Sequence, residues 1–262
     1  MISGDSPGQS APNQTRKAGD PAEGSREETL RQPSEAQAIS PSDRGLSEDA
    51  ALAILKRADL SYEALESLCK NSGLLQHRKV RLALVAHPKT PRHVSFPQLR
   101  HLYTLDLMQL ALIPTVPADV KKVAEETLIN RLETVSVGEK LSLAKRASGS
   151  VAGALLADKD TRVMRAALEN SRLTEVSVVQ SLARQGTQAP LVEAVCHHPK
   201  WSLRQEVRIA LLRNEKTPLA KALEFSRGLS DALLQEILEN SPLSANTKDY
   251  LLKERKGLTA SD

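Results

Sequence analysis

Residues 80–91 read VRLALVAHPKTP, and residues 207–218 repeat this stretch as VRIALLRNEKTP. The offset of 127 residues holds without a gap when residues 62–126 are laid on residues 189–253, which we call the first and second repeat blocks. Self-similarity over this length is typical of proteins that stack one structural unit on the next. The sequence therefore identifies a repeat architecture before any chemical motif is considered.

The pairing extends across both blocks. It matches Glu66 with Glu193, Cys69 with Cys196, Arg100 with Arg227, Leu102 with Leu229, and Leu107 with Leu234. A degenerate unit also occurs between the blocks: an apolar helix of the form V-x-x-A-[LV], then two or three residues, then Asn or His, then Pro or Ser. The spacing of this unit is irregular, but the same two intervals, 16 and then 26 residues, recur in both halves of the chain. This recurrence favours an ancestral duplication of a multi-helix block over a repeat of one small unit.

The pattern of apolar residues from Ser47 onward predicts short amphipathic helices. Apolar side chains recur at spacings of three and four, as in Leu52, Leu55 and Ala58, and sustained alternation of period two is absent. Aromatic residues make up 2% of the chain, so Leu, Ala and Val must build the core, which suits close helix packing. We expect an all-α fold, an α-α superhelix (solenoid) of about fourteen short helices.

The composition divides the chain into three parts. Residues 1–45 are rich in Gly, Pro, Ser and charge, and predict a disordered N-terminal arm. Residues 46–254 predict the helical-repeat solenoid, and residues 255–262 a flexible tail. Residues 1–50 hold five Lys or Arg and nine Asp or Glu, so the rest of the chain, with 31 and 23, carries a net charge of +8. A mildly basic helical surface favours acidic partners.

Several helix ends carry a sequence signal. Ser136 with Glu139, and Ser202 with Gln205, have the spacing of a reciprocal capping box. Thr90-Pro91 and Thr217-Pro218 place a hydroxyl before a proline, which predicts a capping threonine and a proline at the first helical position. Residues 149–153, GSVAG, lack the lysine and the preceding strand of a phosphate-binding loop, and we expect a turn of small residues.

The run V-R-x-A-L-x-x-H/N-P-K-T-P resembles the variant leucine-rich repeat, and more loosely the HEAT-like α-solenoids of bacteria. Val80, Arg81, Ala83, Leu84, His87, Pro88, Thr90 and Pro91 match the variant-repeat pattern; Val207, Arg208, Ala210, Leu211, Asn214, Thr217 and Pro218 match it nearly as well. The resemblance implies a right-handed stack of short helices that binds macromolecules and does not catalyse a reaction. Some family members carry an N-terminal iron–sulfur cluster; residues 1–45 contain no cysteine, so no cofactor is carried over.

Other classes of site find little support. Cys69 and Cys196 fall at equivalent places beside apolar neighbours, which predicts core positions and no disulfide. We interpret the six histidines, at positions 77, 87, 93, 101, 197 and 198, as helix-end residues and not as metal ligands. Trp201 stands nearly alone as a candidate for an aromatic active-site cluster, so we expect no enzyme. The chain has no membrane-spanning run and no secretory leader, and we expect a cytoplasmic protein.

The candidate partner-binding residues are long basic side chains, most of which recur at equivalent places in the two blocks. They are Arg78, Arg81, Lys89, Arg100, Arg204, Arg208, Lys216 and Arg227. Two interpretations stay open. Recurrence in a solenoid aligns residues along one face, where they can meet an acidic peptide or phosphates. Alternatively, Arg81 and Arg208 buttress a neighbouring repeat through helix-end carbonyls.

We therefore expect a non-catalytic helical-repeat scaffold whose partner is another protein or an acidic peptide. The alternative is a nucleic-acid-binding HEAT-like repeat protein that uses the mildly basic face. A net charge of +8 permits this alternative, but the shortage of aromatic side chains for base stacking disfavours it.

Overall fold

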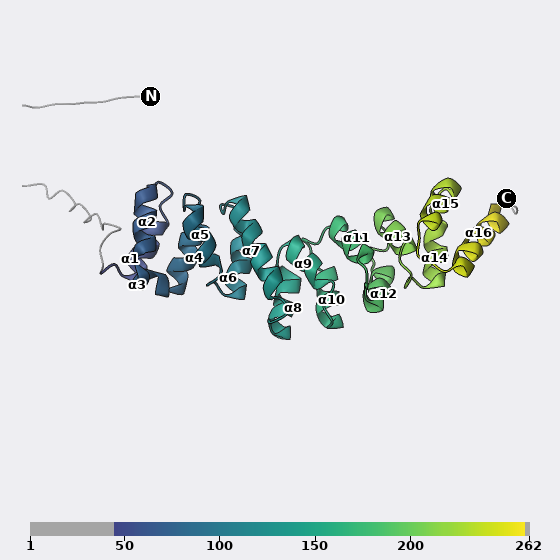
Figure 1. Cartoon of the computed structure of the whole chain (residues 1–262), viewed down its shortest axis with the longest axis horizontal. Coiled ribbons are helices and arrows are strands. Elements are labelled where there is room, and N and C mark those ends of the chain that lie inside the picture. Colours follow the sequence, from purple (N-terminus) through teal and green to yellow (C-terminus); the bar gives the residue numbers. More distant parts are fainter. Residues whose placement is uncertain (1–44, 260–262) are drawn as a thin grey trace, which may run out of the picture. The chain divides into compact units, whose positions relative to one another are not determined.

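The computed structural model of the protein describes residues 45–259, and only the backbone of residues 255–259. Within this range the chain forms sixteen helices and no strand, which confirms the prediction of an all-α fold (Figure 1). The helices are α1 (Glu48–Leu55), α2 (Tyr62–Lys70), α3 (Ser72–Gln76), α4 (Arg78–Ala86), α5 (Arg92–Leu99), α6 (Thr104–Leu112), α7 (Ala118–Arg131), α8 (Val137–Arg146), α9 (Gly149–Leu155), α10 (Thr161–Leu168), α11 (Glu175–Ala183), α12 (Ala189–His197), α13 (Gln205–Leu212), α14 (Leu219–Ser226), α15 (Asp231–Glu239) and α16 (Ala245–Thr259).

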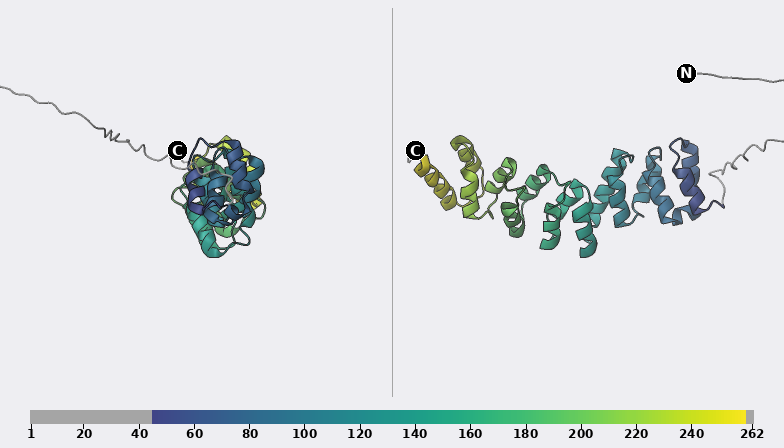
Figure 2. Two further views of the ribbon diagram at one scale, coloured as in Figure 1. Left: turned by 90° about the vertical axis from the view of Figure 1, so that its left-hand side faces the viewer. Right: turned by 180° about the vertical axis from the view of Figure 1, so that it is seen from behind.

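The helices pack in two rows. The first row follows the contacts of α1 with α4, α4 with α6, α6 with α8, α8 with α10, and α10 with α12. The second row follows the contacts of α5 with α7, α7 with α9, α9 with α11, α11 with α13, and α13 with α15. Pairs such as α4 with α5 and α6 with α7 join the rows. The view from behind in Figure 2 keeps the same succession of neighbours as Figure 1.

The two repeat blocks form matching helices. Helices α2, α4, α5, α6 and α7 each begin 127 residues before α12, α13, α14, α15 and α16, respectively. The contacts of α4 with α5, α4 with α6, α5 with α7, and α6 with α7 recur among α13–α16. However, α4 belongs to the first row and its counterpart α13 to the second. Equivalent residues such as Arg81 and Arg208 therefore do not share a row.

The core runs between the rows and is built from aliphatic side chains, as the composition predicts. One cluster of buried residues extends from Val85 to Leu251, and a smaller one, from Ala51 to Leu84, lies under α1–α4. Trp201 is the largest fully buried side chain and lies between α12 and α13, at the place that corresponds to Leu74 of α3. Cys196 is buried and Cys69 half-buried, and both thiols are free. Burial raises the pKa of Cys196 to about 11 and that of Cys69 to about 12.

Buried polar residues join helix ends within each row. We call five of them the helix-end residues: His87, Asn170, His198, Asn214 and Ser241. Each accepts the backbone N–H of the residue two positions ahead; for Asn214 this is Lys216 N, at 3.0 Å from Oδ1. All but His198 also bond a carbonyl at the end of the preceding helix in the row, as Asn214 Nδ2 does to Leu182 O at 2.8 Å. They thus satisfy carbonyls that a helix leaves free at its C-terminus.

The predicted helix starts are partly correct. Ser136 and Glu139 form the expected capping box at the start of α8. Ser202 does not cap: α13 begins after Arg204, and the Ser202 hydroxyl donates to His198 O at 2.8 Å. Thr90 does not cap either, because Pro91 is the N-cap of α5 and the Thr90 hydroxyl donates backward to Leu84 O at 2.6 Å.

Thr217 repeats the behaviour of Thr90. Its hydroxyl donates to Leu211 O at 2.6 Å, and Pro218 is the N-cap of α14. A threonine hydroxyl can donate as well as accept, and in both blocks it closes the end of the previous helix. The predicted role of these two threonines at the next helix start is therefore wrong.

The GSVAG stretch is not a turn. Residues 149–155 form α9, whose small side chains allow close approach of α11 and the turn before it. A Cβ on Gly149 would overlap the backbone oxygen of Arg172, so a side chain at this position would force the backbone to shift. The expectation of a turn is corrected because small residues here serve packing.

The described residues end near the two predicted flexible segments. The predicted arm lies outside the described residues, apart from Gly45. Helix α16 continues to Thr259 and so takes in part of the stretch expected to be a tail. Within residues 45–259, none of the helices has the length and apolar character needed to cross a membrane.

Candidate functional site

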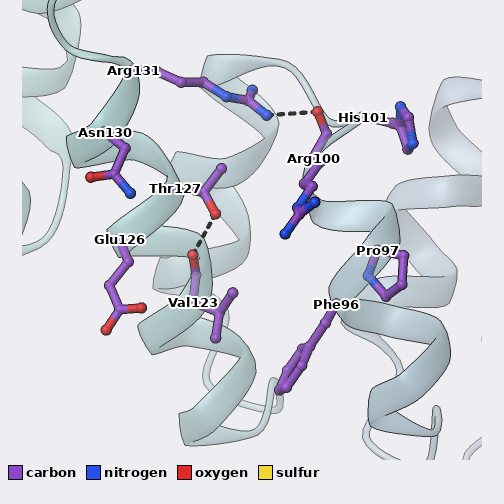
Figure 3. A pocket seen from close by; sticks show the side chains of 9 residues that line it. All are labelled: Phe96, Pro97, Arg100, His101, Val123, Glu126, Thr127, Asn130 and Arg131. Atoms are coloured by element: carbon purple, nitrogen blue, oxygen red, sulfur yellow. Dashed lines mark hydrogen bonds between the residues drawn. The ribbon is translucent and has the colours of Figure 1, made fainter.

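A cleft of about 690 Å³ lies between α5 and α7 (Figure 3). Its lining residues come from the C-terminal half of α5 and the turn after it, and from α7. They are Phe96, Pro97, Arg100, His101, Val123, Glu126, Thr127, Asn130 and Arg131. Arg100 is the one predicted partner-binding residue among them.

The wall formed by α7 is fixed by hydrogen bonds. The Arg131 guanidinium donates to Leu102 O and to Arg100 O, each at 2.7 Å, and so ties the end of α7 to the turn after α5. The Thr127 hydroxyl donates to Val123 O at 2.7 Å within the helix. Figure 3 shows the bond from Arg131 to Arg100 O and the bond from Thr127 to Val123 O. Because the Arg131 guanidinium and the Thr127 hydroxyl already have partners within the chain, they fix the shape of the cleft and leave the hydrogen bonds to a ligand to other residues.

The floor and rim of the cleft differ in character. Phe96 and Val123 are half-buried and pack against the core, so they offer an apolar floor. The Arg100 side chain is exposed and extends from α5 toward α7, whereas Glu126 points away from it (Figure 3). Among the residues that the structure describes, none forms a hydrogen bond or an ion pair with the Arg100 guanidinium. The cleft therefore joins an apolar surface to an unpaired cation.

Five of the other candidates, Arg227 among them, have contacts with side chains or carbonyls of the same chain. Arg78 forms a bidentate pair with Asp106, at 2.6 and 2.7 Å, and lies over the Tyr103 ring. This pair raises the pKa of Arg78, chiefly through the hydrogen bond. Arg208 Nε donates to Ser202 O at 2.6 Å, and Lys216 Nζ to Thr187 O at 2.6 Å. Arg81 donates to two backbone carbonyls.

The sequence did not identify Asp106 as a site residue. It is 3% exposed and is the one charged residue of the mostly apolar helix α6, and this isolated carboxylate was the available signal. A buried carboxylate needs a partner, and Arg78 supplies it. We therefore assign Arg78 first to packing α4 against α6.

Arg81 acts as a buttress. It donates to Leu75 O and, at 3.1 Å, to His101 O, two carbonyls at the ends of α3 and of the segment after α5. Arg208 makes the equivalent contact in the second block, since Ser202 lies 127 residues after Leu75. Of the two interpretations left open by the sequence, these contacts support buttressing for Arg81 and Arg208.

Replacing Arg81 by methionine should lower the free energy of unfolding by about 1.5–3 kcal/mol, because two carbonyls lose a charged donor. The stem of the side chain is kept, so packing changes little. Urea denaturation followed by circular dichroism measures the change. Arg204→Met, at an exposed position, is the matched control and should shift stability by less than about 0.5 kcal/mol. Equal stability of both variants would show that Arg81 is free for a partner.

Lys89, Arg204 and Arg227 are exposed. Arg227 Nη2 lies 3.9 Å from Glu254 Oε1, and Arg204 is the N-cap of α13. Lys89 follows His87 in the turn after α4. None of the three lines the α5–α7 cleft, so the structure does not gather the eight candidates at one place.

The histidines lie at helix ends or on the surface. His87 and His198 are C-caps, and His77 is the N-cap of α4, 3.2 Å from Glu48 Oε2. His198 Nε2 is 3.2 Å from Glu169 Oε1 but lacks hydrogen-bond geometry, and Trp201 Nε1 instead reaches the end of α10, at Leu168 O. Within residues 45–259, no group of three or more His, Cys, Asp or Glu is arranged to hold a metal ion.

Comparison of the chain with protein-family models, curated proteins and solved structures finds no match. The account of its function therefore depends on the residues and contacts described above.

Proposed function

We propose that this protein is a non-catalytic scaffold, a HEAT-like α-solenoid related to variant leucine-rich repeats, that binds another protein. The observation that carries the proposal is the α5–α7 cleft, where an apolar floor meets the unpaired guanidinium of Arg100. Binding surfaces commonly combine such an apolar centre with a few polar groups that fix orientation.

The packing of the helices supports a solenoid. Each close contact joins helices no more than three positions apart in the chain, so a helix is supported by its neighbours alone. This arrangement leaves the outer side of each row available along its length. Large hydrophobic side chains on the surface, among them Tyr103 and Leu203 at more than 60% exposure, fit a protein that meets other macromolecules.

The test is affinity capture from an extract of the source cells, using the full chain and nuclease-treated lysate. We expect the wild-type chain to retain a protein in stoichiometric amount, and Arg100→Glu to lose most of it. Arg204→Glu makes the same change of charge outside the cleft and should retain the partner. Retention of nucleic acid from untreated lysate, with no protein partner, would replace the proposal by the nucleic-acid-binding alternative.

A further inference from the structure

The second repeat block contains the counterparts of the two helices that form the α5–α7 cleft, and there the residue equivalent to Arg100 has a carboxylate near it within the chain. Arg227 of α14 corresponds to Arg100 of α5, and Glu254 of α16 corresponds to Thr127 of α7. In the second block the arginine and the glutamate face each other, with Nη2 and Oε1 3.9 Å apart. In the first block the same place across the cleft holds a hydroxyl already bonded to Val123 O. The guanidinium of Arg100 thus lacks the carboxylate that its equivalent has.

We propose that the α5–α7 cleft binds an acidic peptide segment of a partner protein, with a carboxylate of the peptide taking the place at Arg100 that Glu254 takes at Arg227. This inference rests on the proposed scaffold function and names the class of its partner. Arginine suits the role because its planar donors can bond both oxygens of a carboxylate. Glu254 in the second block is thus an example, within the chain, of the carboxylate that Arg100 is expected to bind.

The other lining residues define the rest of the peptide. Phe96, Pro97 and Val123 form an apolar surface next to Arg100, so an apolar side chain should stand beside the acidic one. Asn130 is exposed at the α7 wall and can bond the backbone of an extended segment. An acidic residue with an apolar neighbour is therefore the recognised feature.

A peptide fits the cleft better than a nucleic acid does. Affinity for nucleic acid comes mainly from several cations that contact successive phosphates. Here Arg131 is bonded to two carbonyls, so it does not add a second free cation to the cleft. One free guanidinium beside an apolar floor matches a single carboxylate and a hydrophobic side chain.

The chain itself suggests the decisive variant. Thr127→Glu introduces the residue that stands at the equivalent position, 254, of the second block, and its carboxylate should pair with Arg100. Thr127→Gln introduces a side chain of nearly the same size as glutamate but without the charge. Exposed ion pairs contribute little to folding, so both variants should melt like the wild type. A difference between them in binding then reports charge and not shape.

The experiment selects peptides from a random twelve-residue library on the immobilised full-length protein, and then measures their affinity by fluorescence polarisation. We expect the selected peptides to be enriched in Asp or Glu next to an apolar residue. Thr127→Glu and Arg100→Leu should each weaken binding of a selected peptide by at least tenfold, and Thr127→Gln by less than about threefold. Binding should also weaken as salt increases.

Three outcomes would overturn the proposal: no peptide is selected, the selected peptides show no acidic enrichment, or they bind the Thr127→Glu variant as tightly as the wild type. Direct binding of a labelled oligothymidylate that is lost in Arg100→Leu, with no peptide selected, would assign the cleft to nucleic acid. A partner captured from the extract independently of Arg100 would leave the scaffold function standing and remove this site from it.

Discussion

Replacing Trp201 by alanine is expected to lower the free energy of unfolding by about 3–5 kcal/mol, the largest effect of any single substitution considered for this protein. The indole is 1% exposed, belongs to the large core cluster, and lies in the segment that joins α12 to α13. Its Nε1 donates to Leu168 O at 2.9 Å, and Lys200 Nζ lies 4.0 Å from the ring centroid. Alanine removes the packing and leaves the carbonyl of Leu168 without its donor.

Trp201→Phe separates these two contributions. Phenylalanine keeps most of the apolar volume and loses the N–H, so we expect a decrease of about 1–2 kcal/mol. Trp201 is the one tryptophan of the sequence, so unfolding should be followed by far-UV circular dichroism and not by fluorescence. A decrease below about 1 kcal/mol for alanine would mean that the ring does not hold α10, α12 and α13 together.

Replacing Asn170 by alanine should cost about 2–4 kcal/mol, since three backbone groups lose their partner at once. Asn170 Nδ2 donates to Ala144 O at 2.7 Å and to Ala147 O at 3.2 Å, and Oδ1 accepts from Arg172 N at 2.8 Å. The residue is 2% exposed, so water cannot readily replace these bonds. Thermal or urea denaturation measures the loss.

The chain provides its own rescue variant. Histidine occupies the same kind of position at His87, where Nδ1 accepts from Lys89 N and Nε2 bonds Arg57 O. Asn170→His should therefore recover part of the stability that alanine loses. Asn130→Ala, at an exposed amide, should change stability by less than about 0.5 kcal/mol. If alanine and histidine at position 170 behave alike, the bonds between successive helices are not what stabilises the row.

The sequence predicted the helical content well because its signals are local. Spacings of three and four identify helices, and Ser136 with Glu139 identifies a capping box from four residues. The same local reasoning failed at Ser202, Thr90 and Thr217, whose hydroxyls donate backward to the preceding helix. A hydroxyl can accept from an N–H of the next helix or donate to a carbonyl of the preceding helix. Which of the two bonds forms depends on where the preceding helix ends in space.

The candidate site was predictable only in part. Recurrence between the blocks selected Arg100, which lines the cleft, and its role in binding stays a prediction. Recurrence also selected Arg81 and Arg208, whose contacts with carbonyls favour the buttressing interpretation of the two that the sequence left open. The opposite wall, with Thr127, depends on how α7 packs beside α5, which no local pattern specifies. Even the alignment of equivalent residues could not be foreseen, because α4 and α13 lie in different rows.

The most direct test of the account is a crystal structure of the full-length protein with a selected peptide. The account predicts a carboxylate of the peptide within hydrogen-bond distance of the Arg100 guanidinium and an apolar side chain of the peptide on Phe96. A peptide bound elsewhere, for example in the second cleft that Arg165, Ala194 and His197 line between α10 and α12, with no carboxylate at Arg100, would contradict it.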